Sequence, residues 1–141
     1  MRLLFDENQG KGVPEALRGV GLKEVSYIRR LYRSELQRDP QRGIKDEEWI
    51  PLAGKDGWLV FSGDKAILEA EAQRQLWIEH HVGGVFLSHN SGTAVDVLKL
   101  VLRKWDWLET IDRNQARPFA YRLNLSGRAR LDSRILRTES A

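Results

Sequence analysis

The chain has 141 residues, which is enough for one domain with a substantial buried core. It contains no cysteine, so disulfides, thiolate zinc sites and cysteine nucleophiles are excluded. Its 23 Lys and Arg against 20 Asp and Glu give a net charge of +3, too small by itself to indicate nucleic-acid binding. No apolar run approaches the roughly 20 residues that span a bilayer, and Met1-Arg2 leads directly into a predicted strand. We therefore expect a cytoplasmic protein without a signal or transit peptide.

Short apolar runs and helix-forming segments alternate along the chain. In order, they predict a strand at 2–6, a helix at 12–18, a strand at 24–28, a loop at 29–43, a helix at 46–53, a strand at 58–61, a helix at 65–80, a strand at 85–88, a helix at 92–112 and a strand at 119–125. The loop lacks clear periodicity and contains Pro40 and Gly43, although a short helical turn could occupy 31–37. The last strand alternates apolar and polar residues, which is typical of an edge strand.

This alternation predicts an α/β fold of three layers, α/β/α, around a mostly parallel five-stranded sheet. No internal repeat, low-complexity tract or domain boundary is visible. We expect one domain over residues 1–125, followed by a basic C-terminal tail over residues 126–141.

Three acidic clusters stand where a predicted strand ends or a predicted helix begins. Asp6 and Glu7 follow the first strand, Asp46 opens a run of three acids, and Asp64 follows the third strand. In an open α/β sheet, ligands bind outside the carboxyl ends of the strands. Carboxylates gathered there repel one another unless a cation lies between them, and hard oxygen ligands select Mg²⁺ or Mn²⁺. The sequence therefore predicts a divalent metal site.

Each acid also has a structural alternative. Asp46 and Asp64 stand at the beginning of predicted helices, where Asp is an ordinary N-cap worth about 1 kcal/mol. Asp6 could make a turn of the Asx type. Because three such positions occur together, we favour the metal site.

Basic residues are concentrated in two segments. The first contains Arg29, Arg30, Arg33, Arg38, Arg42 and Lys45, and the second contains Arg122, Arg128, Arg130, Arg134 and Arg137. Basic segments beside a metal site indicate a surface that binds phosphate groups. The alternative is that they are solvated loops and tails, which are often basic.

Three short motifs occur in order along the first half of the chain. The first strand ends in Leu4-Phe5-Asp6-Glu7-Asn8, a helix opens with Asp46 and reaches Ala53 seven residues later, and the third strand ends in Val60-Phe61-Ser62-Gly63-Asp64. In order and spacing over residues 2–67 they resemble the PIN-like nuclease superfamily, which includes the VapC-type toxins of bacterial toxin–antitoxin pairs. They are most similar to its short PIN-like branch, and beyond residue 90 the resemblance is one of topology only.

The resemblance implies a Mg²⁺- or Mn²⁺-dependent endoribonuclease that is the toxin of a toxin–antitoxin pair and is bound by its antitoxin. Asp6, Asp46 and Asp64 would be the catalytic metal ligands, and Glu7 or Glu47 the fourth ligand. A further family acid would fall in the basic stretch 29–43, whose acids Glu35 and Asp39 fit no motif. The alternative is a catalytically degenerate PIN-like module that binds RNA or a protein partner.

Supporting roles follow from position beside these motifs. The residues that could orient metal ligands, or serve only in turns, are Asn8, Ser62 and Ser88. The residues expected to attract the RNA backbone by charge are Arg29, Arg30, Arg33 and Lys45. The expected partners are RNA and an antitoxin protein, a homodimer is allowed, and no membrane is expected.

Overall fold

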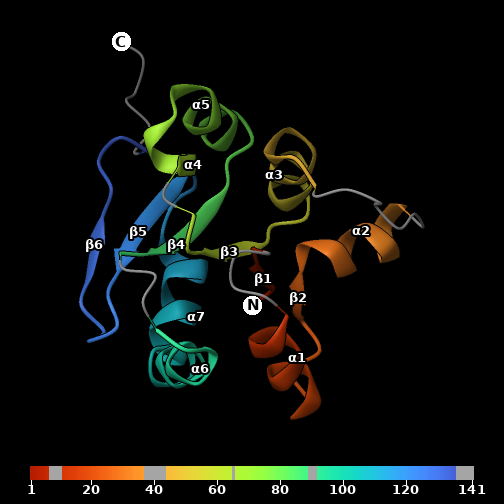
Figure 1. Ribbon diagram of the computed structural model, residues 1–141. Helices are drawn as coiled ribbons and strands as arrows, with labels where there is room; N and C mark the ends of the chain where they lie inside the picture. The colour runs from red at the N-terminus through yellow and green to blue at the C-terminus, as the bar shows by residue number, and fades with distance from the viewer. Residues whose placement is uncertain (7–10, 37–43, 65, 89–91, 136–141) are drawn as a thin grey trace.

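The computed structural model describes residues 1–6, 11–36, 44–64, 66–88 and 92–135. These residues form a sheet of six strands in the order β2-β1-β3-β4-β5-β6 (Figure 1). The strands are β1 (Leu3–Phe5), β2 (Val25–Tyr27), β3 (Leu59–Ser62), β4 (Gly83–Leu87), β5 (Phe119–Leu123) and β6 (Ala129–Leu131). The first five are parallel to their neighbours, and β6 pairs antiparallel with β5. The predicted fold class is confirmed, with one strand more than the five expected.

Helices cover both faces of this sheet. Those in the described part are α1 (Gly12–Gly19), α2 (Ile28–Leu36), α3 (Asp46–Lys55), α4 (Ala66–Glu69), α5 (Glu71–Glu79), α6 (Ala94–Arg103) and α7 (Trp105–Asn114). Helices α1, α6 and α7 lie on one face, and α3, α4 and α5 lie on the other (Figure 1). Two hydrophobic cores result, a first core between the sheet and α1, α6 and α7, and a second core between the sheet and α3, α4 and α5. Side chains alternate along each strand, so Leu3 and Phe5 join the first core and Leu4 joins the second. Within the described residues, no helix is both long and apolar enough to cross a membrane.

The central strands are buried on both faces, which explains their short and purely apolar runs. All five residues of β4 are buried between β3 and β5. A Cβ atom on Gly83 would lie 2.4 Å from the Phe119 ring, and one on Gly84 would lie 2.6 Å from the Trp77 ring. Because these rings are buried, a larger residue at either position would displace them.

Residues 28–36 form helix α2. The sequence predicts a loop from residue 29 with at most a short helical turn at 31–37, so the loop is wrong for 29–36 and the helix is longer than that turn. Residues 37–43 of the predicted loop lie outside the described part. Ile28, Leu31 and Tyr32 have only 2–3% of their surface exposed, and their spacing is that of one helical face. This apolar face is little more than one turn long and arginines interrupt it, which conceals the period in the sequence.

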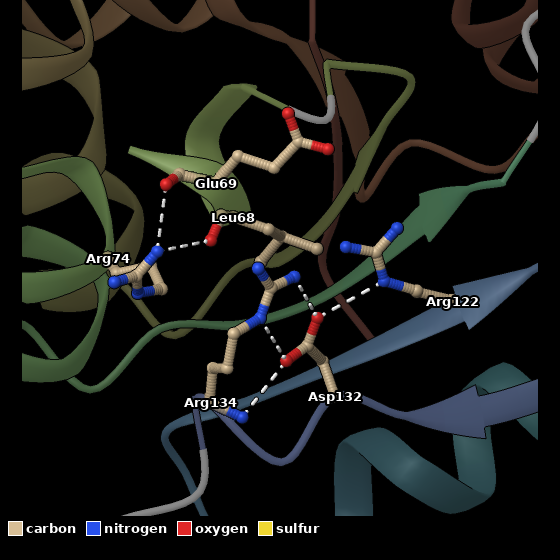
Figure 2. Close-up of polar contacts among 6 residues, drawn as sticks. All are labelled: Leu68, Glu69, Arg74, Arg122, Asp132 and Arg134. Carbon is tan, nitrogen blue, oxygen red and sulfur yellow. Dashed lines mark hydrogen bonds and ion pairs between the residues drawn. The ribbon is translucent and has the colours of Figure 1, made fainter. Parts of the chain in front are cut away.

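Two predicted long helices are each divided in two. Ala70 separates α4 from α5, and Lys104 separates α6 from α7. At the first break, Arg74 donates hydrogen bonds to the carbonyl oxygens of Leu68 and Glu69, at 3.0 and 2.9 Å (Figure 2). These bonds satisfy carbonyl groups that a continuous helix would pair internally.

Strand β6 lies within the segment that the sequence indicates as a tail. It covers β5, so the prediction that β5 is an edge strand is wrong. The turn between them is closed by the Asn124 side chain, whose Oδ1 accepts from the backbone N–H of Arg128 at 3.0 Å. Gly127 adopts a positive φ of 94°, which favours glycine. A polar turn ending in glycine is the local signal that could have indicated a hairpin.

The chain after β6 is held by Asp132, whose side chain is 5% exposed. Its carboxylate accepts from Arg122 Nε at 3.1 Å, from Arg134 Nε at 3.1 Å and from Arg134 Nη2 at 2.8 Å (Figure 2). These bonds, led by those from Arg134, lower the pKa of Asp132 to about 2. Ile135, three residues later, is fully buried in the second core. Asp132 therefore anchors the end of the described chain against the sheet.

Asp132→Asn should lower the free energy of unfolding at pH 7 by about 1–2 kcal/mol, because Arg134 is partly exposed and solvent weakens that pair. The pKa of Asp132 is lower in the folded state than its usual 3.8, so its contribution is present above that pH and is lost as the pH falls toward 2. Urea unfolding of the unaltered chain and of Asp132→Asn should show that their difference in free energy of unfolding becomes smaller from pH 7 to pH 3. Asp56→Asn is the control, since Asp56 makes no ion pair within the described residues. A difference that stays constant with pH would contradict this role.

Candidate functional site

The carboxyl ends of β1 and β3 lie side by side at one edge of the sheet. The two strands are parallel neighbours, with Phe5 paired to Phe61. Asp6 follows β1, and its backbone N–H donates to the carbonyl oxygen of Phe61 at 3.0 Å. The pairing therefore brings Asp6 opposite Ser62, the last residue of β3. This is the edge at which α/β proteins bind ligands.

A chain of hydrogen bonds connects Asp6 to Asp64. Ser62 Oγ donates to Asp6 Oδ2 at 2.8 Å and accepts from the backbone N–H of Asp64 at 2.9 Å. Ser62 is fully buried and Asp6 is 8% exposed. Asp64 Oδ1 in turn accepts from the backbone N–H of Ala66, the first residue of α4, at 3.0 Å. Ser62 thus fixes one carboxylate and the start of the loop that carries another.

Asp46 approaches the same edge from the beginning of α3. Its Oδ1 accepts from Trp49 Nε1 at 3.1 Å, and Trp49 is 1% exposed, so the core holds this carboxylate in place. Burial raises the pKa of Asp46, the bond from Trp49 opposes that change, and the negative charges of Asp64 and Glu47 raise the pKa further. Asp46 therefore lies close enough to Asp64 for the negative charge of Asp64 to affect its ionisation.

Of the other predicted site residues, Glu47 and Ser88 belong to the described part of the chain, and Glu7 and Asn8 do not. Glu47 is exposed in the first turn of α3, and Ser88 is half-buried directly after β4 at the same sheet edge. Glu7 and Asn8 lie outside the described residues. Across the ranges that the structure describes, no group of three or more His, Asp or Glu side chains is placed to hold a metal ion. Asp6, Asp46 and Asp64 share one edge without surrounding a single position.

The predicted RNA-binding residues lie on α2 and before α3. Arg29, Arg30 and Arg33 belong to α2, which begins directly after β2, and Lys45 precedes α3. Arg30 and Arg33 lie near Tyr27, since their positive charges oppose the rise in the pKa of Tyr27 that burial and Glu15 produce. They therefore lie at the carboxyl end of β2, on one side of the acids.

Two aromatic residues that support the site were not predicted from the sequence to do so. Trp49 holds Asp46, and the hydroxyl of Tyr32 donates a hydrogen bond to the Glu48 carboxylate, which joins α2 to α3. Trp49 follows Asp46 by three residues, a spacing that places both on one side of a helix and could have indicated their contact. The contact of Tyr32 with Glu48 joins separate helices and has no such local signal.

A family model described as a PIN like domain matches residues 1–89 of this chain. The matched segment runs from β1 through β4 and contains Asp6, Asp46 and Asp64. Comparisons with curated proteins and with solved structures give no match.

Ser62→Ala should lower the free energy of unfolding by about 1–3 kcal/mol, because it removes the hydroxyl that donates to a buried Asp6 oxygen and accepts from the Asp64 N–H. Urea or thermal unfolding measures this loss. Ser88→Ala is the matched control, since the Ser88 hydroxyl makes no hydrogen bond within the described part of the chain and its removal should cost much less. Equal losses in the two variants would mean that the hydrogen bonds of Ser62 do not stabilise the site.

Proposed function

Because the chain belongs to the PIN-like domain family, we propose that it is a Mg²⁺- or Mn²⁺-dependent endoribonuclease. PIN-like domains are generally nucleases, and the match covers every proposed ligand. The observation that carries the proposal is the hydrogen-bonded series Asp6, Ser62 and Asp64 at the carboxyl ends of two parallel strands. Asp46 adds a third carboxylate within electrostatic reach.

The donor chemistry of this edge fits a hard divalent cation. Asp6, Asp46 and Asp64 offer carboxylate oxygens, the ligands that Mg²⁺ and Mn²⁺ prefer. Negative charge at Asp64 and Glu47 makes ionisation of Asp46 less favourable, and a cation would relieve that cost. Since the described acids do not surround one position, the ligand set would have to be completed when the ion binds, with Glu7 or Glu47 as the fourth carboxylate.

A bound divalent ion would supply an activated water and stabilise the charge that develops on the scissile phosphate. The chain's own residues would hold the carboxylates in position and attract the RNA backbone. Ser62 fixes Asp6, and Trp49 fixes Asp46, so neither carboxylate is free to turn away from the edge. Arg29, Arg30, Arg33 and Lys45 would draw the phosphodiester backbone toward the acids.

The proposed biological role is that of a cytoplasmic toxin restrained by an antitoxin protein. It follows from the resemblance of the acidic motifs to toxin nucleases of this superfamily. A small antitoxin-like reading frame beside the gene would support it, and restoration of growth by co-expressing that frame would test it.

A second candidate is a PIN-like module without catalytic activity that binds RNA or a protein. Two hydrogen bonds favour it, because Asp64 Oδ1 accepts from the backbone N–H of Ala66 at the start of α4 and Asp46 Oδ1 accepts from Trp49. Both acids therefore have a structural function that would keep them in place without a metal. Binding of RNA with no cleavage in Mn²⁺ would select this candidate.

Asp6→Asn should abolish RNA cleavage and the response of stability to metal. For the unaltered chain, Mn²⁺ at about a hundredfold excess over its Kd should raise Tm by about 5–10 °C, because mass action on the folded state then contributes about 2.7 kcal/mol. Thermal unfolding with Mn²⁺ and with EDTA measures this shift, and a labelled RNA measures cleavage.

Asp106→Asn is the control for this experiment. Asp106 is exposed in the first turn of α7, on the other face of the sheet, so this variant should keep both the metal response and the activity. Cleavage that persists in EDTA, or in Asp6→Asn, would refute the proposed chemistry.

A further inference from the structure

A groove lined by arginines lies on the β5–β6 hairpin, away from the basic helix α2. One hollow of about 250 Å³ is lined by Ser88, Arg122, Asn124, Arg128, Ala129 and Arg130. A second hollow of about 430 Å³ shares Arg122 and Arg130 with it and extends to Arg134 and Asp132. We refer to the two hollows together as the arginine groove.

Strand pairing places this groove on the same face of the sheet as the candidate acids. Ser62 pairs with Phe86, Phe86 with Arg122, and Arg122 with Arg130, so these residues form one row across four neighbouring strands. Paired residues of neighbouring strands point to the same face, and Phe86 packs in the core that α3 and α5 cover. Two strand spacings, roughly 10 Å, separate Arg122 from Ser62 along this row. The arginine groove therefore lies on the face of the sheet that carries Ser62, two strands from it and three strands from Asp6.

The groove carries an excess of positive charge. Within the described residues its walls contain four arginines and one acid, Asp132. Asp132 is engaged by Arg122 and Arg134, whereas Arg128 and Arg130 are exposed and form no ion pair with any described residue. Uncompensated positive charge in a hollow attracts anions.

Arg122 is held in an orientation suited to an anion. Its Nε donates to Asp132 Oδ2 at 3.1 Å, and its side chain is 20% exposed (Figure 2). A guanidinium has five N–H donors, and the four on the Nη atoms of Arg122 make no hydrogen bond to described residues. An arginine fixed at Nε can present both Nη atoms to a phosphate as a planar pair of donors.

We infer that the arginine groove binds the phosphodiester backbone of single-stranded RNA beside the candidate acids. Three guanidinium groups, at Arg122, Arg128 and Arg130, favour successive phosphates over an isolated carboxylate. A flexible single strand can follow these hollows into the surface with successive phosphates, which a rigid duplex cannot do. The choice of RNA rests on the proposed function, but binding in the groove is separable from cleavage.

The test measures binding of a fluorescein-labelled 12-nucleotide oligouridylate by anisotropy, with the full chain carrying Asp64→Asn and in EDTA. Adding Arg128→Gln and Arg130→Gln should weaken binding about 25-fold at 0.1 M salt, since each single-strand phosphate contact contributes roughly fivefold there. The slope of log K against log salt should fall by about 1.4 for the two contacts. Lys99→Gln with Arg113→Gln removes the same charge from exposed positions of α6 and α7 and should change both values little.

Each outcome decides the inference. It is overturned if the Arg128→Gln and Arg130→Gln variant keeps its affinity and salt slope, if the Asp64→Asn parent does not bind the RNA, or if an oligoglutamate peptide of equal charge competes as well as RNA. The last result would assign the groove to an acidic protein partner. If the groove variants lose binding while the unaltered chain cleaves no RNA in Mn²⁺, RNA binding by the groove is supported and the nuclease proposal is refuted. If the unaltered chain cleaves RNA and the groove variants bind as before, the nuclease proposal stands alone.

Discussion

The parallel pairing of β1 with β3 is the constraint on which the arrangement of the site depends. It sets Phe5 against Phe61, whose ring centroids lie 5.3 Å apart, and it sets Asp6 against Ser62. A slip of one residue would turn the side chains of one strand to the opposite face, because side chains alternate along a strand. The buried phenylalanines would then meet the wrong core, so the packing that stabilises the sheet also fixes the hydrogen bond from Ser62 to Asp6.

The charges of this edge are arranged around that pairing. Negative groups lie at the ends of β1 and β3, where Asp46 is harder to ionise because of burial and its acidic neighbours. Positive groups lie on both sides, with α2 following β2 at one end of the sheet and the arginine groove on β5 and β6 at the other. An acidic centre between basic flanks suits a polyanion that must be attracted to the surface and held over a cation. This supports a nucleic-acid substrate more directly than the net charge of +3 does.

The family match and the arginine groove come from different parts of the chain. The match ends at residue 89, whereas Arg122, Arg128 and Arg130 follow it on the hairpin that completes the sheet. Asp132 joins that hairpin to Arg134 and positions Arg122 within the same cluster. The matched segment thus contains the acids, and the hairpin that follows it contains the arginines of the groove.

The sequence by itself determined the fold class, the order of the first five strands along the chain, and the position of each acid at a strand end or helix start. These features are local, because an apolar run or a helix-capping acid is visible within a few residues. The structure alone decided that residues 28–36 form a helix, that β6 covers β5, and that Arg122 lies in one row with Ser62. The sequence suggested the acidic edge, but only the tertiary structure joined Asp6 to Ser62, which lie 56 residues apart. Strand pairing and the packing of distant side chains bring such residues together, and neither leaves a pattern in a short stretch of sequence.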